Sequence, residues 1–451
     1  MENDTICAIS TPIGTGGISI VRMSGNNALH YACQIFSCKN LDRQNVKPRY
    51  FYLGNISCAE FDEKCMMVYF QSPHSYTGED LVEFQCHGGV LVTRKILETL
   101  VGVGARLAEG GEFTKRAFIN GKLSLDEAEG VIDTINAESE SELRASSNLV
   151  KGNLHTQIES LQNTITDVLS EINVTFDFPE NDDEEITSKS VMQKLTNVQQ
   201  TLNSIVATSK TGIKLKDGNK VVIVGKPNVG KSSLMNAMLG LDRAIVTDIQ
   251  GTTRDVLEET YIYKGVRFVL TDTAGLRESS DIVESIGIQK ARQSLDSADV
   301  VLFVLDSGST LDDYDMDIIK LLDNKNVIVV LNKVDLKQKI DISTLPFSKV
   351  VSCSTTQNKG IDNLKQTIYD MVIDEKVLSQ NIIITNMRHA NALTKASEFI
   401  AKALDDLHNG LDLELVSINL QSAWNALGEI TGVNQTEEII SNIFSKFCVG
   451  K

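Results

Sequence analysis

The sequence contains few of the features that mark secreted, metal-bound or membrane-spanning proteins. Eight cysteines among 451 residues are too few for a disulfide framework, and no two of them form a C-x-x-C pair, which argues against structural zinc and for a reducing compartment. No run of about 20 apolar residues, the length that a membrane-spanning helix needs, occurs. The first ten residues, MENDTICAIS, lack the basic and apolar regions of a signal peptide. We therefore expect a cytoplasmic protein with no membrane partner.

Basic residues are also scarce. The chain has 43 Lys and Arg against 60 Asp and Glu, a net charge of −17. This balance argues against binding nucleic acid by bulk charge alone, so a nucleic-acid substrate would require a local basic patch or a basic partner. The composition, 42% hydrophobic and 23% charged, is that of a globular protein, and the length predicts about three domains.

The six prolines separate segments with different patterns. Up to about residue 120, short apolar runs alternate with glycine turns, and residues 18–21 and 65–70 predict strands while 91–100 predict a helix. The next 50 residues contain no proline, and their apolar residues at three- and four-residue steps predict long amphipathic helices. The acids at 182–185 are expected in a solvated loop or at a helix start, and a further helix is predicted over 188–209.

Residues 217–375 alternate apolar strands with helices, which predicts a doubly wound, mostly parallel sheet. The predicted strands are 221–224, 267–271, 300–305 and 327–331. From about 385 to 447 the pattern is helical again. The predicted fold class is therefore a multidomain chain with an N-terminal α/β domain, an all-α central helical domain and an inserted α/β domain. The predicted segments are 1–121, 122–216 (first part of the helical domain), 217–376 (inserted domain) and 377–451 (second part of the helical domain).

The strongest functional signal is residues 225–232, GKPNVGKS, which fit G-x-x-x-x-G-K-[ST] between a predicted strand and a predicted helix at 233–239. Backbone N–H groups in such a loop bind phosphates, Lys231 supplies charge at the β- and γ-phosphates, and the Ser232 hydroxyl coordinates Mg²⁺. The alternative is a chance glycine-rich turn, and the motifs that follow argue against it.

Further motifs come at the ends of predicted strands. Asp272-Thr273-Ala274-Gly275 supplies a carboxylate that can hold Mg²⁺ through water and an N–H group, that of Gly275, that can meet the γ-phosphate. Asn332-Lys333-Val334-Asp335 supplies a carboxylate that accepts two N–H groups of guanine, which adenine does not offer. Ser354-Thr355-Thr356 occupies the remaining base-contact position, in place of the usual Ser-Ala-Lys. These motifs resemble the translation-factor-type GTPases, so the inserted domain is predicted to be a Ras-like P-loop GTPase domain that selects GTP.

The residue that follows this Asp-Thr-Ala-Gly motif is Leu276, where Ras-like enzymes have a glutamine that orients the attacking water. Asn228, with carbonyl groups of the 244–252 loop, can cage a potassium ion that replaces an arginine finger; alternatively, Asn228 is an amide that stabilises its own loop. Glu284 is a candidate for the group that positions the water; alternatively, it is an acid on a surface helix. By resemblance, Thr253 completes the Mg²⁺ shell.

The first 122 residues carry three polar, glycine-rich clusters. They lie at residues 11–25 (TPIGTGGISIVRMSG), 75–89 (SYTGEDLVEFQCHGG) and 110–122 (GGEFTKRAFINGK). His87, in the second cluster, is by itself more typical of a hydrogen-bonded structural histidine than of a catalyst. The chain ends in Cys-Val-Gly-Lys, and Cys448 there is either a mobile nucleophile or a bystander.

These stretches, in this order and over essentially the whole chain, resemble the MnmE/TrmE family of tRNA uridine-modification GTPases. The resemblance implies that the chain, with a flavin-containing partner that carries FAD, adds an aminomethyl or carboxymethylaminomethyl group at C5 of the wobble uridine of certain tRNAs. It implies an N-terminal domain that binds 5,10-methylene- or 5-formyl-tetrahydrofolate and mediates homodimerisation. It also implies potassium-dependent dimerisation of the GTPase domains and a heterotetramer-type complex with the partner.

The resemblance assigns roles to particular residues. The folate contacts would be Arg22, Glu83, Lys122 and Lys451. The catalytic residues would be Glu284 and Cys448. The potassium ligands would be Asn228, Thr247, Ile249 and Thr252, and the magnesium ligands Ser232 and Thr253. Together with the motifs, it predicts GTP contacts at Asn228, Val229, Gly230, Lys231, Ser232, Ser233, Thr247, Asp248, Ile249, Gln250, Gly251, Thr252, Thr253, Asp272, Thr273, Ala274, Gly275, Asn332, Lys333, Asp335, Ser354, Thr355 and Thr356.

Two other functions compete with this interpretation. A ribosome-assembly GTPase would have similar nucleotide motifs, but it would be expected to carry a basic RNA-binding module, and the sequence displays none. A folate-binding regulatory protein would share the end clusters and the GTPase control without performing modification chemistry.

Overall fold

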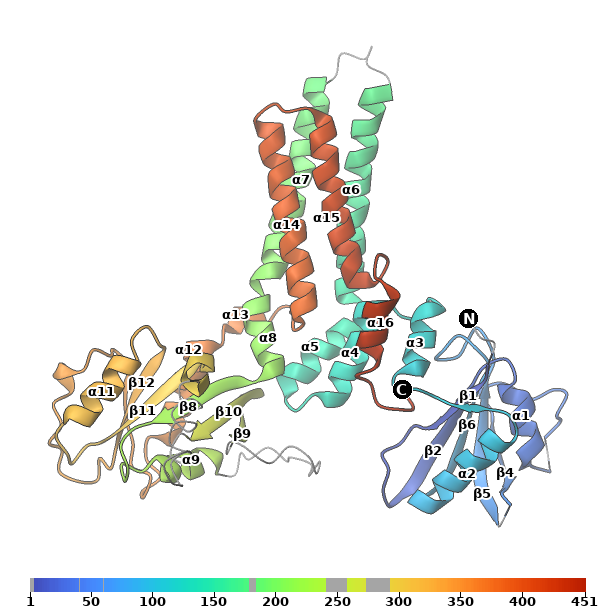
Figure 1. Ribbon diagram of the computed structural model, residues 1–451, viewed down its shortest axis with the longest axis horizontal. Helices are drawn as coiled ribbons and strands as arrows, with labels where there is room; N and C mark the ends of the chain where they lie inside the picture. Colours follow the sequence, from blue (N-terminus) through green and yellow to red (C-terminus); the bar gives the residue numbers. More distant parts are fainter. Residues whose placement is uncertain (1–3, 40, 60, 178–183, 241–257, 273–292) are drawn as a thin grey trace. The chain divides into compact units, whose positions relative to one another are not determined.

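The computed structural model of the chain (Figure 1) describes residues 4–39, 41–59, 61–177, 184–240, 258–272 and 293–451. The chain divides into two compact units. The first unit contains residues 1–132, 149–195 and 398–451, and the second contains 133–148 and 196–397. The predicted segment boundaries given above stay a prediction. In the described part of the chain, no helix is both long enough and apolar enough to cross a membrane.

The first unit contains a seven-stranded sheet in the order β3-β4-β5-β6-β2-β1-β7. Its strands are β1 Ile6–Ile9, β2 Gly16–Ser24, β3 Phe36–Ser37, β4 Phe51–Ser57, β5 Asp62–Phe70, β6 Leu81–Gly88 and β7 Arg106–Leu107. Neighbouring strands are antiparallel except β1 and β7, which are parallel. The two strands and the helix predicted here are confirmed, and the structure extends each of them.

Two helices, α1 (Ala28–Ile35) and α2 (Val90–Gly102), pack on one face of this sheet. Val21, Met67 and Phe84 point into the core beneath the helices, and they are paired neighbours on β2, β5 and β6. Because successive side chains of a strand alternate between faces, the residues next to them lie on the opposite face. Arg22 and Glu83 are such residues.

The rest of the first unit is helical. It contains α3 Glu112–Ile119, α6 Asn153–Asp177, α15 Leu413–Thr431 and α16 Glu437–Phe444, and the boundary between the units passes through α4 Leu125–Asn136, α5 Glu140–Val150, α7 Glu184–Ala207 and α14 Met387–His408. α6 and α15 lie side by side, and Gln162 donates to the Trp424 carbonyl at 3.1 Å. Phe118, Leu125, Phe444 and Phe447 form a small core that joins α3, α4 and the end of the chain.

The proline-free stretch is helical as predicted, but it forms three helices, α4, α5 and α6. The first break lies before α5, where the Ser139 hydroxyl accepts the Glu142 N–H at 3.3 Å and so caps the new helix. The second break lies at Gly152, whose φ of +75° is a left-handed conformation that glycine adopts without strain.

The second unit contains a six-stranded sheet in the order β13-β12-β11-β8-β10-β9. Its strands are β8 Asn219–Val224, β9 Glu258–Tyr263, β10 Val266–Asp272, β11 Val300–Asp306, β12 Val327–Asn332 and β13 Val350–Ser352. All pairs are parallel except the β9–β10 hairpin. The other described elements are α8 Ser209–Asp217, α9 Lys231–Leu239, α11 Asp313–Leu321, the short 3-10 helix η2 Ile342–Thr344, α12 Ile361–Val372 and α13 Glu375–Leu378.

Both faces of this sheet are buried. Val221 and Ile223 belong to a core that contains α9 and α12, whereas Val222 and Val224 belong to the core on the opposite face. Burial on both faces explains why the central strands appear in the sequence as unbroken apolar runs. The predicted fold class, a multidomain chain with α/β and all-α parts and a doubly wound inserted domain, is confirmed. In such sheets ligands bind at the carboxyl ends of the strands.

Candidate functional site

The 225–232 loop follows β8 at the carboxyl edge of the second sheet, and α9 begins at its Lys231. Two glycines are required by close approaches. A Cβ on Gly225 would lie 2.4 Å from the Val304 carbonyl oxygen, and one on Gly230 would lie 2.3 Å from Nδ2 of Asn332. The loop therefore packs directly on the neighbouring strands, and the N-terminus of α9 faces the end of the sheet, where backbone N–H groups favour an anion.

The predicted phosphate-binding lysine is buried against this loop. The Lys231 ammonium donates to the carbonyl oxygens of Gly225, at 2.9 Å, and Lys226, at 2.7 Å. It therefore lies within the curve of the loop, where charge is needed for phosphate binding.

The two described residues that were predicted near magnesium lie together. The Ser232 hydroxyl donates to Oδ2 of Asp272 at 3.1 Å, and Asp272 is buried at the carboxyl end of β10. A hydroxyl and a carboxylate are hard oxygen donors of the kind that Mg²⁺ prefers, so these residues fit this ion. Ser233, another predicted GTP contact, follows Ser232 on α9.

The guanine motif is bonded to the phosphate loop. The buried Asn332 donates from Nδ2 to the Val229 carbonyl at 2.9 Å. Lys333 donates to the Asn228 carbonyl and to Oδ2 of Asp306, both at 2.8 Å. One segment of the chain thus positions both the base-binding side and the phosphate-binding side of the site.

The third base-contact segment joins the same cluster. The Ser354 hydroxyl donates to Oδ1 of Asp335 at 2.5 Å and lies 3.0 Å from the Thr356 hydroxyl. The Thr355 N–H donates to Oδ1 of Asn332 at 3.3 Å. The departure from Ser-Ala-Lys therefore leaves both the serine hydroxyl and a backbone N–H in contact with the guanine motif.

Sequence reasoning missed one ion pair at this site. The Lys226 ammonium lies 2.6 Å from Asp312 and 2.5 Å from Asp315, and these two acids form the capping box of α11. Partial burial acts to lower the pKa of Lys226, but the hydrogen bonds that its ammonium donates to the two carboxylates raise it. The D-x-x-D spacing before an apolar run was the available signal.

Several predicted site residues lie outside the described residues. They are Thr247, Asp248, Ile249, Gln250, Gly251, Thr252, Thr253, Thr273, Ala274, Gly275, Leu276 and Glu284. The potassium ligands other than Asn228, the switch residues and the predicted catalytic glutamate therefore stay predictions.

A second polar cluster lies on the sheet of the first unit. Arg22 and Glu83 are cross-strand neighbours on β2 and β6, and Nη2 of Arg22 lies 2.7 Å from Oε1 of Glu83. The Arg22 guanidinium lies over the rings of Tyr76, at 5.7 Å, and Phe113, at 5.6 Å. Cation–π contacts of this kind hold an arginine in one orientation.

The end of the chain reaches this cluster. Nη1 of Arg22 donates to the Gly450 carbonyl at 3.4 Å. Gly450 has a φ of +95°, and a Cβ there would lie 2.3 Å from the Ile9 carbonyl oxygen, so its backbone packs directly on β1. Cys448 is exposed, and its carbonyl accepts the Lys451 N–H at 3.3 Å.

Lys122, another predicted folate contact, lies on the segment that follows α3. It packs beside Gly78, where an added Cβ would lie 3.3 Å from its Cε. The described structure thus places Arg22 and Glu83 beside the C-terminal segment and Lys122 beside the 75–80 loop. Nδ1 of His87 lies 2.7 Å from Oε1 of the buried Glu63, and the His87 side chain itself is 72% exposed.

Three features lie at one edge of a doubly wound sheet: the phosphate loop, a carboxylate at the end of β10 and a guanine motif at the end of β12. Together they define a P-loop GTPase. Comparison with known proteins specifies the family. The family model described as the MnmE helical domain matches residues 125–448, and the model described as the N-terminus of the GTP-binding protein TrmE matches residues 5–122. The chain belongs to the MnmE family of tRNA modification GTPases, and it is accordingly a GTPase that binds GTP. The resemblance found in the sequence is confirmed.

Full-length relatives support the same assignment. The tRNA modification GTPase MnmE of Clostridioides difficile is 41% identical over 100% of this chain and 99% of the relative. MnmE of Desulforamulus reducens is 41% identical over the whole of both chains. Among solved structures, the chain is similar to a variant of Aquifex aeolicus Era bound to GDP.AlF4-, with 29% identity over 40% of this chain and 66% of that one. Its TM-score is 0.28, too low for a conclusion.

Proposed function

We propose that this GTPase, together with a flavin-containing partner, installs an aminomethyl-type group at C5 of the wobble uridine of certain tRNAs. The observation that carries the proposal is the position of the C-terminal Cys-Val-Gly-Lys segment, whose Gly450 accepts a hydrogen bond from the Arg22–Glu83 pair. This segment brings an exposed thiol and a lysine to a charged cluster on the N-terminal sheet.

The N-terminal cluster is proposed to bind tetrahydrofolate. Folates are anionic through their glutamate tail, and Arg22, Lys122 and Lys451 supply positive charge in this region. Arg22 is preoriented by Glu83 and by two aromatic rings, so it can bind without a large loss of side-chain entropy. When bound, the folate would supply the one-carbon unit, and the proposed role of Cys448 is to act on the uridine.

The GTPase cycle is proposed to use Mg²⁺ and potassium. Ser232, with Thr253, would hold Mg²⁺, and Asp272 would hold it through water. Asn228 has a positive φ of +65°, and its carbonyl accepts a hydrogen bond from Lys333. This contact fixes the loop, and the side chain of Asn228 would reach a cation from there. Hydrolysis that proceeds much faster in potassium chloride than in sodium chloride is expected, and equal rates in the two salts would contradict the cation proposal.

A homodimer is proposed from the apolar surface of the N-terminal sheet. On the face opposite α1 and α2, the residues Ile18, Phe51 and Leu53 are 63%, 51% and 59% exposed. Exposed apolar side chains gathered on one face mark interaction sites. The proposed parts of the chain are the folate-binding and dimerisation domain 1–121, the helical domain 122–216 with 377–451, and the GTPase domain 217–376.

The chain's net charge of −17 suggests how tRNA is bound. The partner is proposed to carry most of the basic surface, while this chain supplies folate and the GTP-driven switch. Measurement of tRNA affinity for the chain alone and for its mixture with the partner tests this division. Equal affinity would contradict it. The function itself is tested by analysis of wobble nucleosides in cells that lack the chain; unchanged nucleosides would instead favour a GTPase switch in ribosome assembly.

A further inference from the structure

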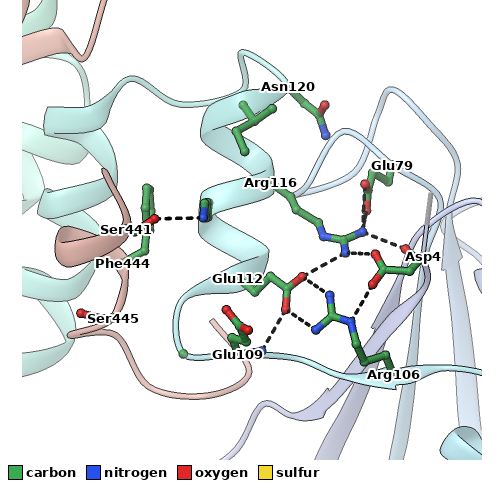
Figure 2. Close-up of a pocket in the computed structure, with 13 residues that line it drawn as sticks. Asp4, Glu79, Arg106, Glu109, Glu112, Arg116, Asn120, Ser441, Phe444 and Ser445 are labelled. Atoms are coloured by element: carbon green, nitrogen blue, oxygen red, sulfur yellow. Dashed lines mark hydrogen bonds and ion pairs between the residues drawn. The ribbon is translucent and has the colours of Figure 1, made fainter. Parts of the chain in front are cut away.

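The Gly110-Gly111-Glu112 segment belongs to neither the nucleotide site nor the proposed folate contacts. It leads into α3, and Gly110 and Glu112 line a cavity of about 410 Å³ between α3 and α16 (Figure 2). Figure 2 shows the charged side chains of Asp4, Arg106, Glu112 and Arg116 gathered on one side of this cavity. The question is whether these side chains serve a ligand or one another.

The charged groups on this wall are bonded to one another. Oε1 of Glu112 accepts from Arg106 at 2.7 Å and from Arg116 at 3.0 Å, and its Oε2 accepts a second bond from Arg106 at 3.1 Å. Asp4 lies 2.6 Å from Arg106 and 2.7 Å from Arg116. Each guanidinium nitrogen of Arg106 donates to a protein oxygen. The network therefore has a structural task rather than the binding of an anion.

Glu112 connects this network to a turn of the backbone. Its Oε2 accepts the Glu109 N–H at 2.9 Å, and the Glu112 N–H donates back to the Glu109 carbonyl at 3.3 Å. Gly111 has a φ of +69°, and a Cβ on it would lie 2.5 Å from the Phe444 carbonyl oxygen. The turn at 109–112 is thus fixed by a carboxylate on one side and packs closely on the end of α16 on the other.

The same turn holds the end of the chain. Gly110 forms a β-bridge with Val449, and the Gly111 N–H donates to the Cys448 carbonyl at 3.3 Å. Arg106 and Arg116 therefore bond to Glu112, Glu112 bonds to the 109–112 turn, and the turn bonds to the segment that carries Cys448.

We propose that Arg106 and Glu112 are positioning residues that hold the C-terminal segment 448–451 in place for the uridine chemistry. The mechanical part of this inference is that Arg106 and Glu112 hold the segment in place, and it stands on the contacts alone. The functional part is that this placement serves the uridine chemistry, and it rests on the proposed function. Burial acts to raise the pKa of Glu112, but the hydrogen bonds from Arg106, the Glu109 N–H and Arg116 hold it below the ordinary value, so the carboxylate keeps its charge at neutral pH.

The experiment uses the full chain with the substitution Glu112→Gln, which keeps the shape and removes the charge. Hydrogen exchange measured by mass spectrometry reports on the peptides that contain 109–113 and 444–451. We expect exchange in both to become about tenfold faster, because hydrogen bonds to a charged group are the stronger ones. Glu112→Asp, which keeps the charge, should restore part of the protection. Glu98→Gln, which removes a carboxylate from an exposed ion pair on α2, is the matched control and should exchange like the wild type.

A second readout separates this inference from the proposed function. GTP hydrolysis by Glu112→Gln is expected to be unchanged, while the content of modified wobble uridine in cells that carry it falls. Faster exchange in the terminal peptide with normal modification would uphold the mechanical part and overturn the functional part. Exchange within twofold of the wild type would overturn the inference whatever the nucleosides show.

Loss of folding would be recognised by faster exchange throughout β1 to β6. In that case Arg106→Met is the deciding variant, because it leaves the pair between Glu112 and Arg116 in place. Faster exchange confined to the turn and the terminal peptide is then expected. Unchanged exchange in those peptides would overturn the inference.

Discussion

At the scale of residues, the nucleotide site depends on side chains that serve two motifs at once. Asn332 and Lys333 belong to the guanine motif, yet their amide and ammonium groups donate to carbonyls of the phosphate loop, those of Val229 and Asn228. A substitution at either position should therefore weaken binding of the phosphates as well as the base. Asp335 differs, because its described contact is with Ser354 in the other base-contact segment.

Asp335→Asn should change the nucleotide that the chain prefers. An amide presents a donor where guanine also presents donors, so we expect GTP affinity to fall about 100-fold, the effect of losing hydrogen bonds to a charged acceptor. Xanthosine triphosphate, which carries a carbonyl at position 2, should bind better than it does to the wild type. Nucleotide titration checks both. Asp317→Asn, at an exposed ion pair of α11, is the control, and unaltered GTP affinity in Asp335→Asn would refute the assigned role.

The network of Asp4, Arg106 and Glu112 should make stability depend on pH. Hydrogen bonds from Arg106 lower the pKa of Asp4 below its ordinary value, and the pKa of Glu112 also lies below its ordinary value despite burial. A carboxyl group with a lowered pKa stabilises the fold above its unfolded-state pKa and loses this contribution as the pH falls. We expect Arg106→Met to lower the melting temperature by a few degrees at pH 7, for a loss of about 1 kcal/mol. The difference should shrink between pH 5 and 3, and a constant difference would contradict this explanation.

At the scale of elements, the strands that the sequence predicts best are those buried on both faces. β8, β10, β11 and β12 appear as apolar runs and were predicted to within about two residues. β9, with the sequence EETYIY, was not predicted, because it lies at the sheet edge and only Tyr261 in it is fully buried. The predicted helical stretch is divided into α4, α5 and α6 by Ser139, which caps α5, and by Gly152, which has a positive φ. Neither residue changes the apolar pattern of the sequence much, so the pattern did not reveal the breaks.

Gly432 should be required for the packing of the end of α15 against α3 and α4. It ends α15 with a φ of +93°, and a Cβ there would lie 2.9 Å from Leu125 and from the Phe118 ring. Gly410, after α14, has a φ of +67° and nothing within 4 Å of such a Cβ. Both Gly→Ala variants incur backbone strain of about 1 kcal/mol, but Gly432→Ala adds a clash in a packed core and should lose about 2 kcal/mol more. Denaturant unfolding distinguishes them, and equal losses would show that the junction yields without strain.

At the scale of the whole molecule, the ends of the chain illustrate what a single sequence does not reveal. The motifs at 225–232, 272–275 and 332–335 are local, so their chemistry could be predicted without coordinates. Asp4 and Arg106 are separated by about 100 residues and Arg22 and Gly450 by more than 400, and no local pattern pairs them. For that reason Arg22, Glu83 and Lys451 are expected folate contacts through the resemblance alone, and neither the residue patterns nor the resemblance indicated the Glu112 network.

The apolar face of the N-terminal sheet yields a prediction about assembly. Leu53→Glu places a charge in the proposed homodimer interface, twice by symmetry, and should raise the dimer dissociation constant by about 100-fold. Leu91→Glu is the matched control, because Leu91 is 67% exposed on α2, which covers the opposite face of the sheet. Sedimentation at several concentrations measures both. A dimer that tolerates Leu53→Glu as well as Leu91→Glu would place the interface elsewhere.

The central claim is that this GTPase acts on the wobble uridine through its C-terminal segment. The most direct test is nucleoside analysis of tRNA from cells that lack the chain and from the same cells carrying either the wild type or Cys448→Ser. We predict that the aminomethyl-type groups disappear with the chain, return with the wild type and do not return with Cys448→Ser, although that variant hydrolyses GTP normally. Nucleosides that are unchanged when the chain is absent would contradict the claim.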